Sequence, residues 1–536
     1  MSDATLTLVG DDFIDLVAAT YPAAATLIGI HDHDAELGSY TEQSMAEFAS
    51  QLRALKAKVE SVEQTSLSAA GAIDKRFMLH QMDSALLEAE GTQWWRKNPD
   101  HAIEVALTGL FFLMTREFAP AAQRARSMEA RLRRLPSFLE EARRTLADSP
   151  RVLTETAAQS AEAGAEFLGG VLPMWARELG NDGGLVRETA VAGAEELRRH
   201  AAWLRDEYMP RSTGQTGVGE ELLASVIATN HLLPDSPDEI ARRGEEMIER
   251  LQDSLAQVAS ELGYADWRAA VEEAKKDLPT AEQLIDTYDE EMRWSRDVVR
   301  ELGLATEVEG APLEVRETPS FWRHTTPYAA YTPPGPFEPD QRGVFWVTPP
   351  DGDAEKLKGH ARAAIKVVAL HEGFPGHHLQ LTRANKHASR VRRLADSALL
   401  IEGWAFYCEE MAYEEGLLSP ESRLCQLKDE LWRACRIVID MRLHQQRMTT
   451  QEAVDLLVNE ADLERPNAEA EVRRYTYTPG YQMSYAIGKQ EIMRLRDQVK
   501  AKEGRSFSLS RFHDAVLAEG SMPVPLVAEA VLGRLA

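Results

Sequence analysis

The sequence predicts a mainly α-helical protein that folds as two lobes. Its 536 residues exceed the roughly 250–300 residues over which a single hydrophobic core keeps growing. Apolar side chains recur every three or four positions through most of the chain, which is the period of an amphipathic helix. Residues 343–348, which read Gly-Val-Phe-Trp-Val-Thr, have instead the composition of a β-strand. A helical fold with one small β element is therefore expected.

The first residues predict an interrupted helix followed by a polar loop. Residues 11–30 have helical spacing that is broken at Pro22 and ends near Gly29. The next residues, His31 to Asp34, read His-Asp-His-Asp and have the composition of a metal-binding cluster. Loops are also rich in Asp because its side chain stabilises turns. A turn is therefore the favoured interpretation of this run.

Longer helices are expected further along the N-terminal half. Between residues 41 and 90 the apolar positions follow a helical period: Met45, Phe48, Leu52, Leu55 and Val59. Residues 101–149 continue this pattern. Pro120 and Pro136 are expected at helix boundaries, because proline cannot donate the backbone hydrogen bond of a helix interior.

A loose passage over residues 210–219 separates the two predicted lobes. It is rich in Pro, Ser, Thr and Gly, and it divides the chain into lobes of residues 1–215 and 216–536. The second lobe opens with helices predicted over 238–262 and 281–302. Each of them follows a Ser-Pro or Pro-Thr pair that is typical of a helix start.

Composition limits the classes of protein to which the chain can belong. The formal net charge of −26 argues against binding to nucleic acid or anionic membranes, since both require basic surfaces. No apolar stretch approaches the ~18 residues of a membrane-spanning helix, and no signal-peptide pattern opens the chain. Three cysteines without a Cys-x-x-Cys pair are typical of a reducing compartment. A cytoplasmic protein is therefore expected, of an oligomeric state that composition does not indicate.

The most distinctive stretch for chemistry begins at His371 and reads His-Glu-Gly-Phe-Pro-Gly-His-His-Leu-Gln. In the zinc peptidase motif H-E-x-x-H, two histidines four positions apart bind the metal from one helical face. Here His377 follows His371 by six positions and His378 follows it by seven. On an unbroken helix neither could share a zinc ion with His371, because zinc–nitrogen bonds are about 2 Å long.

Pro375 and the glycine after it remove this objection. Proline breaks a helix, so a second helical segment is expected to start at Pro375 in a new direction. Glu402, in Glu-Gly-Trp-Ala, lies just inside a following helix that can return to the same point. Two histidines and a glutamate with an open position are a known ligand set of zinc peptidases, and Glu372 would be the general base. The alternative is a pair of surface histidines.

These motifs resemble those of the DUF885 family of bacterial proteins of unknown function. The resemblance rests on His-Glu-x-x-Pro-Gly-His-His-x-Gln, on Glu-Gly-Trp-Ala, and on two later segments, residues 440–444 and 479–488. Tyr481 stands where the family has glutamine. The recognisable motifs lie between residues 310 and 490.

The family is in turn similar to gluzincin-type peptidases, and this resemblance implies the architecture and the cofactor. It implies a two-lobed, metallopeptidase-like helical fold with a deep channel and a small β element next to the metal site. It also implies Zn²⁺ held by His371, His377 and Glu402, with Glu372 as catalytic base. The family pattern favours His377, and His378 is the alternative ligand. The channel would admit short peptides or peptide-like amides.

Further residues are candidates for roles around this site. His444 and Tyr485 are candidate catalytic donors to the oxyanion that forms when water attacks an amide. Arg474 is a candidate for binding a substrate carboxylate, and Glu409 for orienting a ligand histidine. The predicted strand could offer an edge to an extended peptide, or it could belong to a hairpin that only covers the core.

The leading expectation is a zinc-dependent peptidase or amidase. A di-iron protein would need Glu-x-x-His pairs, and none of the fourteen histidines follows a glutamate by three positions. A non-catalytic protein that binds metal or peptide on the same scaffold is the other alternative.

Overall fold

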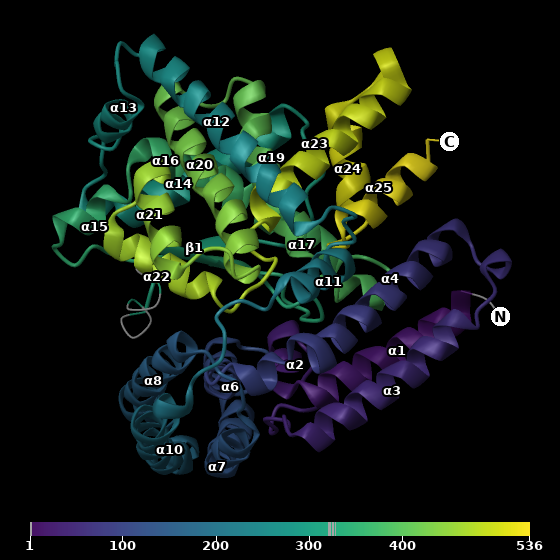
Figure 1. The fold of residues 1–536 in the computed structure, drawn as a ribbon, viewed down its shortest axis with the longest axis vertical. Coiled ribbons are helices and arrows are strands. Elements are labelled where there is room, and N and C mark those ends of the chain that lie inside the picture. Colours follow the sequence, from purple (N-terminus) through teal and green to yellow (C-terminus); the bar gives the residue numbers. More distant parts are fainter. Residues whose placement is uncertain (1–2, 320–322, 324–325, 327, 536) are drawn as a thin grey trace. The chain divides into compact units, whose positions relative to one another are not determined.

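The computed structural model describes residues 3–319, 323, 326 and 328–535 of the chain. Helices account for most of these residues, and the strands among them form a single three-stranded sheet (Figure 1). The prediction of a mainly helical fold with a small β element is confirmed. Within the described residues, no helix has both the length and the apolar character needed to cross a membrane.

The chain forms two compact units. The first contains Met1–Val218 together with the short segment Gly335–Asp340, and the second contains Gly219–Pro334 and Gln341–Ala536. The predicted lobe boundary after residue 215 lies just before the observed change of unit. The sequence did not predict that residues 335–340 would belong to the first unit.

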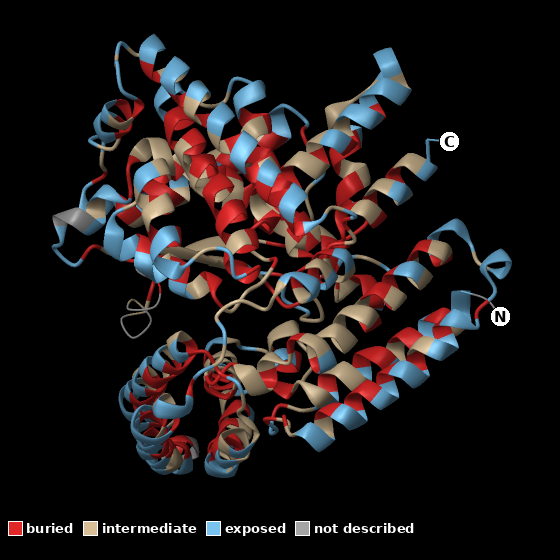
Figure 2. Cartoon of the chain, viewed as in Figure 1, coloured by how far each residue is buried: buried red, intermediate tan, exposed pale blue. Residues whose placement is uncertain are grey.

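In its described residues, the first unit contains helices and loops but no strand. Its buried side chains lie on the helix faces that pack against each other, and exposed residues occupy the outer faces (Figure 2). The helices are α1 (Asp3–Thr20), α2 (Pro22–Ile28), α3 (Glu42–Glu60), α4 (Ala69–Leu86), α5 (Trp94–Lys97), α6 (His101–Thr115), α7 (Ala121–Thr145), α8 (Arg151–Glu166), α9 (Leu172–Glu178) and α10 (Gly184–Trp203).

Proline marks helix ends in this unit with one exception. As predicted, α2 starts at Pro22 and ends at Gly29, which adopts the left-handed conformation that glycine tolerates. Pro120 precedes α7, as predicted. The prediction of a boundary at Pro136 is wrong, because α7 continues through it. Burial of the apolar side chains around Pro136 compensates for the lost hydrogen bond.

The His-Asp-His-Asp loop holds the segment Gly335–Asp340 in the first unit. His31 lies 3.1 Å from Asp34 through Nδ1 and 3.2 Å from Glu338 through Nε2. Its ring also stacks on Phe118 at a centroid distance of 3.6 Å. Burial alone would lower the pKa of His31, but hydrogen bonds to the two carboxylates raise it to about 9. Contacts of His31 with Asp34 and Glu338 therefore hold the segment to the loop, and we call these three side chains the clamp.

Replacing His31 by glutamine is expected to remove a pH-dependent part of the stability. Because the folded pKa is raised, the contribution of His31 is complete below its unfolded value of 6.5 and is lost as pH rises through about 9. The free energy of unfolding should fall by about 1–2 kcal/mol over this window in the natural protein, after discounting for solvent exposure. Urea unfolding at pH 6 and 9.5 measures it. A His33→Gln variant is the control, and equal pH slopes in all three proteins would contradict the clamp.

The second unit combines helices with the sheet. Its helices are α11 (Glu220–Asn230), α12 (Pro237–Glu261), α13 (Trp267–Ala274), α14 (Leu284–Glu301), α15 (Ala354–Lys358), α16 (Arg362–Val368), α17 (His377–Asn385), α18 (Arg390–Arg393), α19 (Ala398–Glu414), α20 (Pro420–His444), α21 (Thr450–Ala461), α22 (Arg465–Tyr475), α23 (Ser484–Glu503), α24 (Leu509–Leu517) and α25 (Val524–Gly533). The predicted starts of α12 and α14 are confirmed within a turn, with Ser236 capping α12.

The sheet contains β1 (Leu313–Glu317), β2 (Ala329–Thr332) and β3 (Gly343–Val347) in the order β1-β3-β2. The predicted strand is β3, and it pairs in parallel with β1 and antiparallel with β2. Both of its edges are occupied, so the suggestion that β3 offers an edge to a peptide is wrong. Phe345 and Val347 of β3 pack on Tyr288 and Met292 of α14 and on Ile365 of α16.

Candidate metal centre

The helix that carries His371 changes its winding just before the histidine. Helix α16 continues directly into η9 (Ala369–Gly373), a wider π-helical turn that contains both His371 and Glu372. Such turns occur often at functional sites. The chain then passes through a cis Phe374–Pro375 peptide bond, and α17 starts at His377 with Gly376 as its first flanking residue. The predicted break is present, although the second helix starts two residues later than expected.

Gly376 allows the two halves of the motif to approach each other. A Cβ atom built on Gly376 would overlap the carbonyl oxygen of His371, so no other residue fits without moving the backbone. The imidazole rings of His371 and His377 consequently lie edge to face, with centroids 4.7 Å apart. Six positions of sequence thus separate two rings that are in contact.

His371, His377 and Glu402 converge on one point. One ligand atom from each lies within 4.8 Å of the others, and no other group of this kind occurs in the described part of the chain. His377 Nε2 lies 3.5 Å from Glu402 Oε2. Two ligands bound tetrahedrally to zinc at about 2.0–2.1 Å would be about 3.3 Å apart. The donor set is one that zinc takes with an open position, and the separation of His377 and Glu402 is close to that of two zinc ligands.

The protonation states suit a cation. Burial and the charge of His377 hold the pKa of His371 well below its usual value, so its imidazole is neutral and can donate a lone pair. Burial would raise the pKa of Glu402, but His377 lowers it to about 2. The Glu402 carboxylate in turn raises the pKa of His377 against the effect of burial.

Two further side chains fix the orientation of the ligands. His371 Nδ1 donates a hydrogen bond to Glu409 Oε1 at 2.7 Å, which turns Nε2 toward the other ligands. Glu409 is buried, as expected for an orienting residue and not for a solvent-facing acid. Tyr481 donates its hydroxyl to Glu402 Oε1 at 2.9 Å and leaves Oε2 facing His377. The sequence indicated Tyr481 only as a departure from the family pattern and gave it no role.

His378 faces away from this cluster. Its Nε2 donates to the carbonyl of Ala311 at 3.0 Å, and its Nδ1 accepts from the hydroxyl of Tyr331 at 2.9 Å. Burial lowers its pKa to about 4, so the ring is neutral and both nitrogens are already used. His378 therefore connects α17 to the sheet, and His377 is the histidine that joins the cluster.

Glu372 lies beside the cluster without being one of its three members. Burial raises the pKa of its carboxyl, whereas the charge of His377 lowers it and that of Glu402 raises it. Glu372 directly follows His371 in η9, so its backbone lies at the cluster. A buried carboxyl in such a position, with its pKa raised by burial, is suited to accept and release protons.

The structure does not bring His444 to the cluster. His444 is fully buried, and its Nε2 donates to the carbonyl of Tyr475 at 3.0 Å. One turn earlier, Asp440 accepts hydrogen bonds from the backbone of Gly480 and Met483. Both residues fix the turn that presents Tyr481, and the predicted role of His444 as an oxyanion donor has no support in this geometry.

Tyr485 and Arg474 lie outside the group of three converging side chains. The Tyr485 ring packs on Tyr481 and Phe406 at centroid distances of 6.0 and 5.9 Å, so it lies next to two residues that contact the candidate ligands. Arg474 donates to Glu471 at 2.7 Å, and this ion pair occupies the guanidinium that was expected to bind a substrate carboxylate.

Comparison with known proteins places the chain in a family. The profile of a family described as "Bacterial protein of unknown function (DUF885)" matches residues 22–531. The chain belongs to DUF885. Comparison with curated proteins finds no match.

Two solved structures share the fold of this DUF885 protein. One, from Shewanella oneidensis, is provisionally described as a lipoprotein of unknown function. It has 24% sequence identity and a TM-score of 0.83 over 98% of this chain and 99% of its own. The other, from Colwellia psychrerythraea, is also provisionally described as a lipoprotein. It has 19% identity and a TM-score of 0.85, with 99% of each chain covered. At these identities the likeness establishes the fold alone.

The Glu-Gly-Trp-Ala motif of this DUF885 protein positions Glu402 through its neighbours. Gly403 and Gly488 face each other where α19 crosses α23, and a Cβ on either would overlap the backbone of the opposite helix. The indole of Trp404 donates to the carbonyl of Pro375 at 2.8 Å. Helix α19 is therefore fixed on one side to α23 and on the other to the break between the two histidines.

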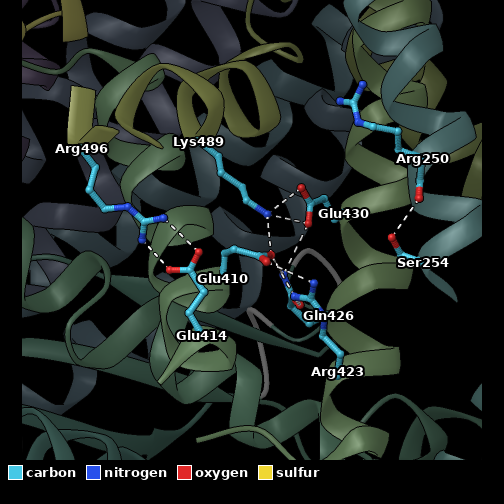
Figure 3. A network of polar contacts seen from close by, with 9 residues as sticks. All are labelled: Arg250, Ser254, Glu410, Glu414, Arg423, Gln426, Glu430, Lys489 and Arg496. Carbon is cyan, nitrogen blue, oxygen red and sulfur yellow. Dashed lines mark hydrogen bonds and ion pairs between the residues drawn. The ribbon is translucent and has the colours of Figure 1, made fainter. Parts of the chain in front are cut away.

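A buried network of charges connects α19, α20 and α23 (Figure 3). Lys489 Nζ lies 2.7 Å from Glu430 and 2.9 Å from Glu410, and Arg423 donates to Glu410 at 2.8 Å. Burial would raise the pKa of Glu410, but Lys489 and Arg423 lower it to about 2. Each buried charge thus has a partner, so removing one side chain would leave an unpaired buried charge. The network therefore holds the three helices together.

Replacing Gly376 by alanine is expected to weaken metal binding in this DUF885 protein. The added methyl group would push α17 away from the carbonyl of His371 and separate the two histidines. We expect zinc affinity to fall by about 10- to 100-fold, as for other changes just outside a metal's ligands. Competition with a chromophoric chelator measures it. A Gly533→Ala variant, where the methyl meets no neighbour, is the control, and unchanged affinity in Gly376→Ala would contradict this role.

Proposed function

We propose that the protein is a zinc-dependent hydrolase of short peptides or peptide-like amides. The observation that carries this proposal is the convergence of His371, His377 and Glu402 within 4.8 Å. Glu409 and Tyr481 orient two of these side chains, as expected of a functional metal site. A two-lobed, metallopeptidase-like architecture with a channel that excludes folded proteins belongs to the same proposal.

The neighbouring residues would divide the chemistry among them. When bound, zinc would supply a Lewis acid that polarises the amide carbonyl and acidifies water. The Glu372 carboxylate would accept the proton of the attacking water and deliver it to the leaving amine nitrogen. Tyr485, whose ring packs on that of Tyr481, would donate to the developing oxyanion, because the single hydroxyl proton of Tyr481 already goes to Glu402.

Metal analysis combined with peptide cleavage tests this function. Protein purified without added metal is expected to contain about one zinc per chain, since the cluster offers one site. It should cleave members of a mixed peptide library, lose this activity on chelation and regain it with zinc. Absence of zinc, or cleavage that survives chelation, would contradict the proposal. Bound zinc with no cleavage would favour the non-catalytic metal-binding alternative.

A further inference from the structure

Arg433, on α20, has hydrogen-bond donors that the protein does not use. Its Nε atom is buried and has no hydrogen-bond partner among the described residues. Its Nη1 atom lies 3.4 Å from the carbonyl oxygen of Asp429 and 3.7 Å from the carboxylate of the same residue. Charge-assisted hydrogen bonds are about 2.7–2.9 Å long, so these contacts are weak. Most N–H groups of this guanidinium therefore have no close acceptor among the described residues.

Aromatic rings hold this guanidinium in place without using its N–H groups. The Arg433 carbon Cζ lies 4.2 Å from the ring centroid of Trp432, 5.2 Å from that of Phe406 and 5.9 Å from that of Tyr485. Cation–π contacts of this kind fix the plane of the group and leave its edge free. A fixed and unpaired guanidinium edge is the arrangement that binds carboxylates in bidentate fashion.

The rings that hold Arg433 also contact the candidate metal centre. Phe406 packs edge to face on His371 at 5.5 Å, and Tyr485 packs on Tyr481, which donates to Glu402. A single layer of aromatic rings therefore separates Arg433 from the candidate metal ligands.

Neighbouring arginines do not share this property. Arg436, one turn along α20, donates through Nε to Gln482 at 3.0 Å, and Arg423 donates to Glu410 at 2.8 Å. Arg474 is paired with Glu471. Of these four guanidinium groups, Arg433 alone lacks a close acceptor on the protein within the part of the chain described.

We propose that Arg433 binds a carboxylate of the substrate, and that the hydrolase therefore acts on short peptides with a carboxylate near the scissile bond. This inference rests on the proposed function and names its substrate class. The carboxylate can be the C-terminus of the peptide or an acidic side chain, since both present the same planar pair of oxygens.

A competing role for Arg433 is to serve as the counter-charge of Glu409. Glu409 Oε2 is also buried without a hydrogen-bond partner, and the charge of Arg433 lowers the pKa of Glu409, which burial raises. No ion pair joins the two side chains in the described structure, whereas Glu409 does contact His371 at 2.7 Å. If this role were the main one, loss of Arg433 would act on zinc binding and not on substrate selection.

Peptide binding to a zinc-loaded Glu372→Gln background separates these roles without turnover. Isothermal calorimetry would compare an alanine tripeptide as the free acid, as the C-terminal amide, and as an amide with aspartate in the last position. We expect the free acid to bind about tenfold more tightly than the amide, which corresponds to about 1.4 kcal/mol. Arg433→Met should abolish the difference. Arg433→Lys should keep part of it, because the charge remains but the fork is lost. Arg474→Met is the matched control and should keep all of it.

The outcomes distinguish this inference from the proposed function. Equal affinity for all three peptides, a preference that survives Arg433→Met, or binding of none of the peptides would overturn the assignment of Arg433. Loss of zinc in Arg433→Met would also overturn it, in favour of the role toward Glu409. If the aspartate amide binds tightly, the ligand of Arg433 is a side-chain carboxylate. If it binds weakly while the free acid binds tightly, the ligand is the C-terminus. Either result supports a carboxylate subsite at Arg433. If peptide cleavage survives chelation, the proposed zinc-dependent function is wrong. The preference for the free acid could still be observed in that case, so the two failures are distinguishable.

Discussion

Replacing Glu372 by glutamine is expected to lower kcat for peptide cleavage by about 10²- to 10⁴-fold, the usual contribution of a general base. Glutamine has the same shape but cannot accept a proton from water. Zinc content should be unchanged, because Glu372 is not one of the three converging side chains. Steady-state kinetics on a peptide that the natural protein cleaves would be measured together with metal content.

Glu415→Gln provides a control for this variant, since Glu415 is an exposed acid at the end of α19. It should retain full kcat and full zinc content. Undiminished cleavage by Glu372→Gln with zinc bound would show that another group accepts the proton. Loss of zinc from Glu372→Gln would instead make Glu372 a ligand.

His377→Ala is expected to lose bound zinc almost completely, whereas His378→Ala should retain it. The first change removes one of three protein ligands, and the buried pocket offers no replacement, since both nitrogens of His378 are bonded elsewhere. The second change leaves the cluster intact but deletes two buried hydrogen bonds. It should lower the free energy of unfolding by about 2 kcal/mol or more.

Zinc per chain after dialysis and urea unfolding of the metal-free proteins measure the two effects separately. Each variant is the other's control, because the two histidines are neighbours in sequence and both are buried. Zinc retained by His377→Ala and lost from His378→Ala would reverse the assignment of the ligand.

Local signals in the sequence were sufficient for most helix boundaries. Pro22 and Gly29 act through their own backbone geometry, so their effect could be predicted without knowledge of neighbours. Pro136 could not, because its tolerance inside α7 depends on side chains packed from other helices. The strands β1 and β2 were not predicted either. They are four to five residues long and are stabilised through β3, a partner distant in sequence.

The candidate site was predictable where ligand chemistry and spacing were visible in one segment. His371, Glu372, His377 and Glu402 were named from such motifs, and Glu409 from its position two turns after Glu402. The choice between the adjacent histidines required tertiary contacts. For His444 a motif could not indicate which way the side chain points, and its Nε2 contacts the carbonyl of Tyr475.

Tyr481 and Arg433 illustrate what sequence alone lacked. Tyr481 reaches Glu402 across 79 positions of chain, and no local pattern encodes such a bond. Arg433 is distinguished by a buried Nε atom without an acceptor among the described residues, which is a property of its surroundings and not of its sequence neighbours.

The contact between Gly376 and the carbonyl of His371 bears on how such sites can change during evolution. Compared with His-Glu-x-x-His, this chain has two more residues between its histidines, yet the rings lie only 4.7 Å apart. The two added residues lie where the backbone folds back on itself, so they do not increase the distance between the two histidine rings. Insertions and deletions are therefore compatible with an unchanged metal centre when they fall at such a fold-back. Sites of this kind are better compared by the atoms that converge than by the interval between them.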